Sequence, residues 1–213
     1  MNTQTRKLTT LAMFGVLAYL SMVLIRIPIV PAPPLKYEPK DVIIVIGGFI
    51  YGPLSCLVLS LIVSLIEMFT VSETGYWGLI ANVLATCTFA CTAALIYKIK
   101  RKLSFVIIGL ISGSLLATGS MLLWNYWVVP IYQGWPPATV AAMLVPVFLP
   151  YNLLKTALNT GFTLLLYKPV RLALARAGLL PAPSEKKKLN TDVLVAAALI
   201  IAACILLIVA WRL

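Results

Sequence analysis

Three polar side chains recur at helical spacing in an otherwise apolar stretch of the sequence. Residues 145–167 read VPVFLPYNLLKTALNTGFTLLLY and contain Asn152, Lys155 and Asn159. Spacings of three and four residues place these side chains on one face of a helix. Two amides and one cation, with Phe148 and Phe162 extending the face, fit a flat organic molecule with polar edges better than a bare ion. The pattern therefore predicts a binding surface for a small organic ligand.

The element that carries this face is long enough to cross a bilayer. Lys155 would lie roughly 15 Å along such a helix, near mid-membrane. A lysine at that depth costs about 2.5 to 3.5 kcal/mol, so it normally faces protein or a water-filled cavity and marks a functional site. A second interpretation is that Lys155 pairs with a carboxylate of a neighbouring helix and only holds the bundle together.

The composition identifies the class of protein. Of the 213 residues 62% are hydrophobic and only 11% are charged, which indicates an integral membrane protein. The net charge of +11 gathers in loops, so it reports on orientation in the lipid bilayer and predicts no nucleic-acid partner. The sequence has no histidine and no G-x-x-x-x-G-K-[ST] motif. We therefore expect no metal site, no cofactor and no ATP hydrolysis by this chain itself.

The cysteines give no sign of a disulfide framework. Cys56, Cys87, Cys91 and Cys204 all fall inside apolar segments. Cys87 and Cys91 share a helical face, but two thiols without further ligands indicate packing rather than a metal site.

Seven apolar segments predict an all-α integral membrane protein. Their expected ranges are 8–25, 41–52, 54–70, 79–97, 103–129, 145–167 and 193–211. The proline-rich residues 26–41 predict a structured loop, with Asp41 as the N-cap of the second helix and Gly52-Pro53 as its end. The uncharged residues 130–144 predict another loop.

Four further polar or aromatic residues are candidates for the same site. Glu67 shares a face of the third helix with Ser60 and Ser64. It could pair with Lys155 or line the same pocket. Asn82 falls in the first turn of the fourth helix. Asn125 and Tyr126 lie between two tryptophans, and membrane-interface anchoring explains the aromatic rings but not Asn125.

The positions of the basic residues predict the orientation. Lysine and arginine gather before the first helix, after the fourth and after the sixth, whereas the opposite side holds Arg26, Lys36, Lys40 and Arg212. The positive-inside rule then places the N-terminus in the cytoplasm and the C-terminus outside. On this orientation the pocket would open to the outside.

Small residues line one side of the first helix. Ala12, Gly15, Ala18 and Ser21 recur every three residues, so another helix could approach closely. The stripe could serve internal packing or dock a second protein.

The sequence resembles the substrate-binding S components of energy-coupling factor (ECF) vitamin transporters, and among them the riboflavin-specific members. The matching segments are KYEPKDVIIVIGGFIYGPLS, IANVLATCTFACTAALIYKIKRK, NYWVVPIY and PYNLLKTALNTGFTLLLYKPV, which cover most of residues 8–175. The more specific features are an acidic residue before a G-F-x-x-G-P turn and a P-[FY]-N-x-x-K pattern.

The resemblance implies a six-helix bundle over residues 1–176 that holds a vitamin near its outer side, under the first loop. A T component and two ATPase subunits would be the partners, and Ala12, Gly15 and Ala18 would form the docking surface. Asn125 and Lys155 match positions that look like flavin contacts, and Asn82 matches an A-N pair. The implied role is substrate binding, not enzyme activity.

The sequence departs from the riboflavin members at three places. Val63-Ser64 stands where they usually have Lys-Asn, Glu67 has no counterpart, and a seventh helix at 191–213 follows a cytoplasmic basic linker at 177–190. The cargo could therefore be riboflavin or another vitamin or cofactor precursor. An intramembrane enzyme with Lys155 and Glu67 as acid and base is a third hypothesis, which the missing histidine and nucleophile disfavour.

Overall fold

Helices form nearly all of the structure, a computed structural model that describes residues 3–30, 35–180 and 191–212. The elements are α1 (Thr3–Leu24), β1 (Ile27–Val30), β2 (Leu35–Tyr37), α2 (Lys40–Tyr51), α3 (Pro53–Thr70), α4 (Gly75–Thr86), η1 (Cys87–Cys91), α5 (Thr92–Ile99), α6 (Leu103–Gln133), α7 (Pro137–Met143), η2 (Leu144–Phe148), α8 (Leu149–Arg176) and α9 (Thr191–Arg212). The π-helical segments η1 and η2 join their neighbours into continuous helical units. The prediction of an all-α membrane protein with seven helical segments is confirmed.

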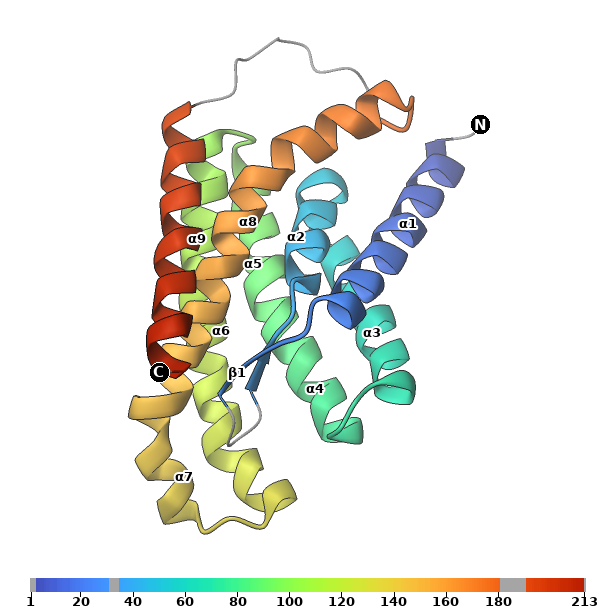
Figure 1. Cartoon of the computed structure of the whole chain (residues 1–213). Coiled ribbons are helices and arrows are strands. Elements are labelled where there is room, and N and C mark those ends of the chain that lie inside the picture. The colour runs from blue at the N-terminus through green and yellow to red at the C-terminus, as the bar shows by residue number, and fades with distance from the viewer. Residues whose placement is uncertain (1–2, 31–34, 181–190, 213) are drawn as a thin grey trace.

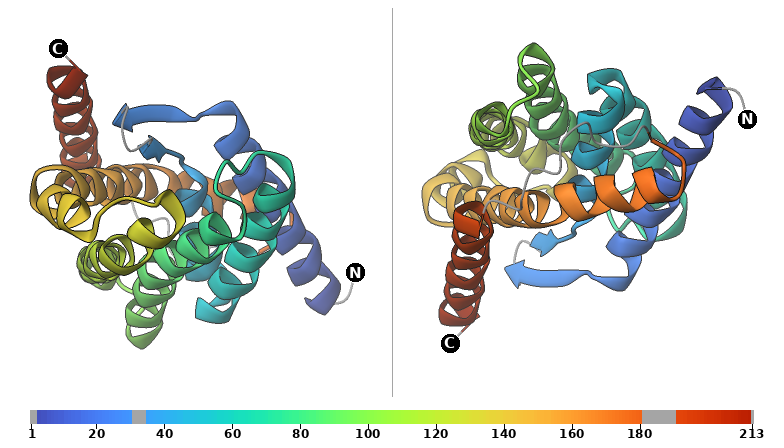
Figure 2. Two further views of the ribbon diagram at one scale, coloured as in Figure 1. Left: turned by 90° about the horizontal axis from the view of Figure 1, so that it is seen from below. Right: turned by 90° about the horizontal axis from the view of Figure 1, so that it is seen from above.

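Six of these helical units are long and apolar enough to cross a membrane. The seventh, α2, has only 12 residues and is apolar on all sides beyond its first two residues, Lys40 and Asp41. A helix of that kind must be buried, and α2 contacts α1, α3, α5 and α8 in the middle of the bundle (Figure 1). Seen along the bundle, the other helices surround it (Figure 2).

Several predicted helix boundaries are wrong. Asp41 is not the N-cap of α2: the helix begins at Lys40 after Pro39, and Asp41 is buried in its first turn. The predicted loop 130–144 is mostly helical, because α6 continues through Pro130 to Gln133 and α7 begins at Pro137. Pro137 is tolerated there because the first turn of a helix needs no backbone N–H from it.

The predicted loop 26–41 contains a short β-hairpin. Strands β1 and β2 are antiparallel, with Ile27 opposite Tyr37 and Pro28 opposite Lys36. The Tyr151 hydroxyl of α8 donates a hydrogen bond to the Lys36 carbonyl oxygen at 2.7 Å. This bond fixes the hairpin over the polar face of α8.

The last helix, α9, packs along α8. Ala197 and Cys204 are buried at this contact, and Ile201 approaches Gly161 of α8. The other sides of α9 carry exposed apolar residues, as expected for a helix that faces lipid. Of the predicted linker 177–190, residues 181–190 lie outside the described part of the chain.

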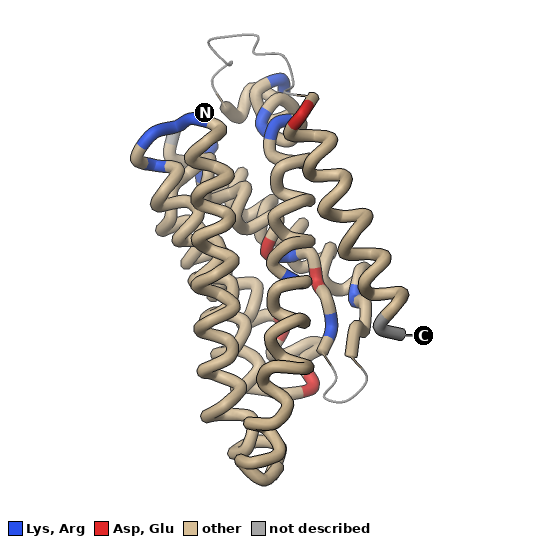
Figure 3. The backbone as a smooth tube through the Cα atoms, turned by 90° about the vertical axis from the view of Figure 1, so that its left-hand side faces the viewer, with Lys and Arg blue, Asp and Glu red and all other residues tan. Residues whose placement is uncertain are grey.

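Lysine and arginine gather at one end of the bundle. This end holds the start of α1, the turn between α5 and α6, and the last turns of α8 (Figure 3). Helix α9 starts at the same end and finishes at the opposite one (Figure 1). The two ends of the bundle therefore differ strongly in charge.

Two glycines let α6 pack directly on the backbone of the neighbouring unit. A Cβ at Gly109 would lie 2.8 Å from the Ala93 carbonyl oxygen, and one at Gly113 would lie 2.5 Å from that of Phe89. Glycines four residues apart commonly allow such close helix contacts in membranes.

We expect Gly113→Ala to destabilise the protein by about 1 to 3 kcal/mol, because the new methyl group must push the two backbones apart. Thermal unfolding in detergent measures this. Gly119→Ala is the matched control in the same helix, since a Cβ there meets nothing within 4 Å. Equal unfolding temperatures for the two variants would contradict the proposed packing.

Candidate functional site

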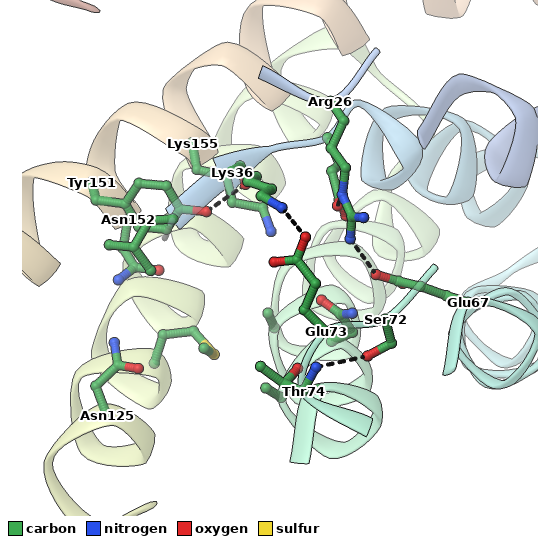
Figure 4. A pocket seen from close by; sticks show the side chains of 17 residues that line it. Arg26, Lys36, Glu67, Ser72, Glu73, Thr74, Asn125, Tyr151, Asn152 and Lys155 are labelled. Atoms are coloured by element: carbon green, nitrogen blue, oxygen red, sulfur yellow. Dashed lines mark hydrogen bonds and ion pairs between the residues drawn. The ribbon is translucent and has the colours of Figure 1, made fainter. Parts of the chain in front are cut away.

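A polar cavity of about 170 Å³ lies beneath the hairpin, among α3, α4, α6 and α8 (Figure 4). Five of the residues selected from the sequence line it: Glu67, Asn82, Asn125, Asn152 and Lys155. They come from four helices and are up to 88 positions apart in sequence, between 67 and 155. The fold therefore brings the main candidates together around one cavity.

Helix α8 contributes one wall through Tyr151, Asn152 and Lys155. The Asn152 side chain donates a hydrogen bond to the Phe148 carbonyl oxygen at 2.7 Å, which fixes the amide. Its own amide oxygen accepts no hydrogen bond from the described residues and remains an acceptor for a ligand. Sequence reasoning did not select Tyr151, although its position four residues before Lys155 places it on the same face.

Lys155 has a carboxylate partner, and the partner is Asp41 of α2. Its Nζ lies 3.8 Å from Asp41 Oδ2, and the Lys155 side chain is 14% exposed. The Thr86 hydroxyl donates to Asp41 Oδ1 at 2.6 Å, and the Asn159 amide donates to Oδ2 at 3.2 Å. Lys155 thus pairs with a carboxylate and also lines the cavity, and its role in ligand binding stays a prediction.

Asn159 lies behind the cavity rather than on its wall. It is 1% exposed, and its hydrogen bond to Asp41 fixes the carboxylate that faces Lys155. The prediction that Asn159 shares the helical face of Lys155 is correct, but its side chain contacts Asp41 and does not line the cavity.

A second charged cluster borders the cavity. Glu67 forms a salt bridge with Lys40, whose side chain is fully buried. Glu67 also lies 3.7 Å from Arg26. Glu38 pairs with Arg26 at 2.7 Å and with Lys40 at 3.3 Å. Of the two roles predicted for Glu67, the structure shows the pocket-lining one, and the Lys155 partner is Asp41 instead.

The protonation state of Glu38 follows from its surroundings. Burial favours the neutral acid, but the positive charges of Lys40, Lys155 and Arg26 hold the pKa of Glu38 below its usual value. Glu38 is therefore ionised at neutral pH.

Two contacts fasten the rim of the cavity. Lys36 of the hairpin pairs with Glu73 at 2.5 Å, and Arg26 donates to the Val71 carbonyl oxygen at 3.0 Å. The hydrogen bond and the charge of Lys36 lower the pKa of Glu73. These contacts tie the hairpin to the loop between α3 and α4.

Two sequence predictions do not fit this geometry. Tyr126 is 40% exposed and its ring packs 5.1 Å from that of Trp127, so it does not line the cavity with Asn125. Successive residues of a helix point about 100° apart, which turns Tyr126 away from the cavity when Asn125 faces inward.

The small-residue stripe of α1 also divides between two environments. Ala12 is exposed, whereas Ala18 is fully buried against the core. The Cβ position of Gly15 is 3.6 Å from the Leu59 side chain, so Gly15 packs on α3. The prediction that Ala18 belongs to a docking surface is wrong, because internal packing covers it.

A curated protein and a solved structure resemble this chain over most of its length. The curated riboflavin transporter RibU of Staphylococcus aureus (strain TCH60) is 29% identical over 173 residues, which are 78% of this chain and 90% of that protein. A solved structure described as the S component of a bacterial ECF transporter superposes with a TM-score of 0.70 at 28% identity, covering 80% of this chain and 98% of the other.

The family model described as "ECF transporter, substrate-specific component" matches residues 6–167, which include every helix that lines the cavity. The same residues form the continuous bundle around α2. This chain belongs to the family of substrate-specific components of ECF transporters.

Proposed function

We propose that this chain captures riboflavin outside the cell and presents it to a T component and two ATPase subunits for import. The observation that carries the proposal is the convergence of Asn82, Asn125, Asn152 and Lys155 on one cavity. Amides can exchange hydrogen bonds with the imide edge of a flavin ring and with ribityl hydroxyls, and a lysine can donate to a ring carbonyl. The similarity to the curated S. aureus riboflavin transporter supports the same cargo.

Entry of the cargo requires the rim to open. The cavity of about 170 Å³ is smaller than the roughly 300 to 1,000 Å³ of pockets that enclose drug-sized ligands. The hairpin contacts Lys36–Glu73 and Arg26–Val71 bridge its rim. The open state would thus part the hairpin from the loop between α3 and α4.

One departure from the riboflavin pattern lies away from the cavity. Val63 and Ser64 are buried in the bundle and do not line the site, so they need not change the cargo. Glu67 does line it and is the reason to retain another vitamin as the second candidate. The family match is to a transport component, so we propose no enzymatic step.

The proposed orientation places the basic end of the bundle in the cytoplasm and the end of α9 outside. It rests on the positive-inside rule and on the charge difference between the two ends (Figure 3). The cavity would then open toward the outer surface, where a captured vitamin arrives.

The proposed function is tested by uptake into proteoliposomes that contain this chain, a T component and both ATPases. We expect ATP-dependent accumulation of labelled riboflavin that excess unlabelled riboflavin suppresses and other vitamins do not. Accumulation of another labelled vitamin but not of riboflavin would keep the transporter class and reject the cargo. Equal uptake without this chain would reject its role.

The proposed docking face on α1 is tested at Ala12, which is the exposed residue of the predicted set Ala12, Gly15 and Ala18. Ala12→Trp should prevent assembly with the partner subunits, because a large ring blocks close helix contact, while riboflavin binding stays unchanged. Co-purification of the subunits measures assembly. Met13→Trp, at an exposed neighbouring position that already has a long side chain, is the control. Normal assembly of the Ala12 variant would exclude Ala12 from the interface.

A further inference from the structure

A second cavity, separate from the vitamin site, lies at the basic end of the bundle. Its volume is about 890 Å³, and its walls come from α5, the turn before α6, α6, α8 and the first turn of α9. Four cations line it, namely Arg101, Lys102, Lys168 and Arg171, against a single carboxylate, Asp192. The family match ends at residue 167, so two of these cations and all of α9 lie beyond it.

Arg101, Lys102 and Arg171 outnumber the one carboxylate of the cavity wall, Asp192. No ion pair joins Arg101, Lys102 or Arg171 to a carboxylate of the described chain, in contrast to the fully paired clusters at the vitamin site. Like charges held in one cavity repel each other, and an anion between them would remove that repulsion. The cations converge from two sides, the turn before α6 and the end of α8.

Part of the wall of the same cavity is apolar. Leu103 of α6, Leu164 of α8 and Val193 of α9 line it together with the cations. The cavity thus combines cationic and apolar side chains in one wall. Its volume is within the range of about 300 to 1,000 Å³ for sites that enclose whole organic ligands, far more than a free phosphate ion would fill.

We propose that this cavity is a site for the phosphate headgroup of an anionic glycerophospholipid, formed by the addition of α9 to the bundle. Arg101, Lys102 and Arg171 bind the phosphate, and one acyl chain lies against Leu103 and Val193. Basic pockets between transmembrane helices near the cytoplasmic surface are known to recognise such headgroups. The bound lipid would join α9 to α6 and α8 at the basic end.

Lipid retention tests this proposal without use of the vitamin site. The full chain in detergent is titrated with phosphatidylglycerol or with zwitterionic phosphatidylcholine, and bound lipid is counted by native mass spectrometry. We expect one phosphatidylglycerol per chain and no comparable retention of phosphatidylcholine. Equal retention of the two lipids would overturn the proposal.

Paired variants locate the binding. Arg101→Gln with Arg171→Gln should weaken phosphatidylglycerol binding roughly 30-fold, which corresponds to about 1 kcal/mol for each cation removed. Lys98→Gln with Arg176→Gln removes two charges from the same end but none from the cavity wall, so it should bind as the unmodified chain does. Equal binding by the two variants would overturn the proposal.

A further arm separates a lipid from a free anion. Inorganic phosphate at millimolar concentration should neither displace the lipid nor raise the unfolding temperature. If phosphate displaces the lipid and raises the unfolding temperature as much as phosphatidylglycerol does, the cations bind a free phosphate group and the lipid assignment is wrong. Riboflavin binding should be equal in both variants, so failure here and failure of the proposed function are distinguishable.

Discussion

Replacing Lys155 by alanine should weaken riboflavin binding by about 100-fold, because truncating one member of a buried charge pair in a binding site costs roughly 2 to 5 kcal/mol. The side chain lies at the cavity wall with Asp41 behind it. The loss has two parts: a missing donor to the ligand, and a negative charge on Asp41 that then faces the ligand uncompensated. Flavin fluorescence in a titration measures the affinity.

The second part can be separated from the first. Lys155→Ala combined with Asp41→Asn removes both charges and leaves an amide that can still accept a hydrogen bond from Thr86. We expect the double variant to bind better than the single one but worse than the unmodified chain. The control Lys98→Ala removes a lysine far from the cavity and should have no effect. Unchanged affinity of Lys155→Ala would remove Lys155 from the site.

Lys40→Met should have the largest effect on stability. Lys40 is fully buried and contacts both Glu38 and Glu67, so its loss leaves two buried carboxylates with Arg26 as their only cation in the cluster. Breaking a buried pair from one side costs about 3 to 5 kcal/mol, because the remaining charge stays buried without its partner. Thermal unfolding of the detergent-purified protein measures the loss.

Two variants show whether burial is the cause. Lys36→Met breaks the pair with Glu73, whose side chain is 60% exposed, and should cost no more than about 1 kcal/mol. Lys40→Met with Glu67→Gln removes one charge of each sign and should recover part of the lost stability. If Lys40→Met unfolds at the same temperature as Lys36→Met, the buried cluster does not stabilise the fold.

Much of this architecture could be predicted because membrane helices are recognisable in a sequence by their length and hydrophobicity. The seven segments, the end of α2 at Gly52 and the shared face of Asn152 and Lys155 all follow from composition and periodicity. The resemblance of the P-Y-N-x-x-K segment then indicated the family. These features depend on local sequence, and the sequence alone therefore predicts them.

The wrong predictions for Asp41, Ala18 and Tyr126 concern contacts between segments that are distant in sequence. Asp41 looks like a helix cap in sequence, but it is buried and faces Lys155 because α2 lies inside the bundle. The inward position of Ala18 and the outward position of Tyr126 depend on how α1 and α6 are rotated. Rotation follows from packing against neighbours, and periodicity alone does not specify which neighbours those are.

The most direct test of the central claim is a titration of riboflavin with the detergent-purified chain while flavin fluorescence is recorded. The account predicts saturable quenching at one site per chain, lost in Lys155→Ala and retained in Lys98→Ala. Folded protein, shown by a cooperative thermal transition, that produces no quenching would contradict riboflavin as the cargo.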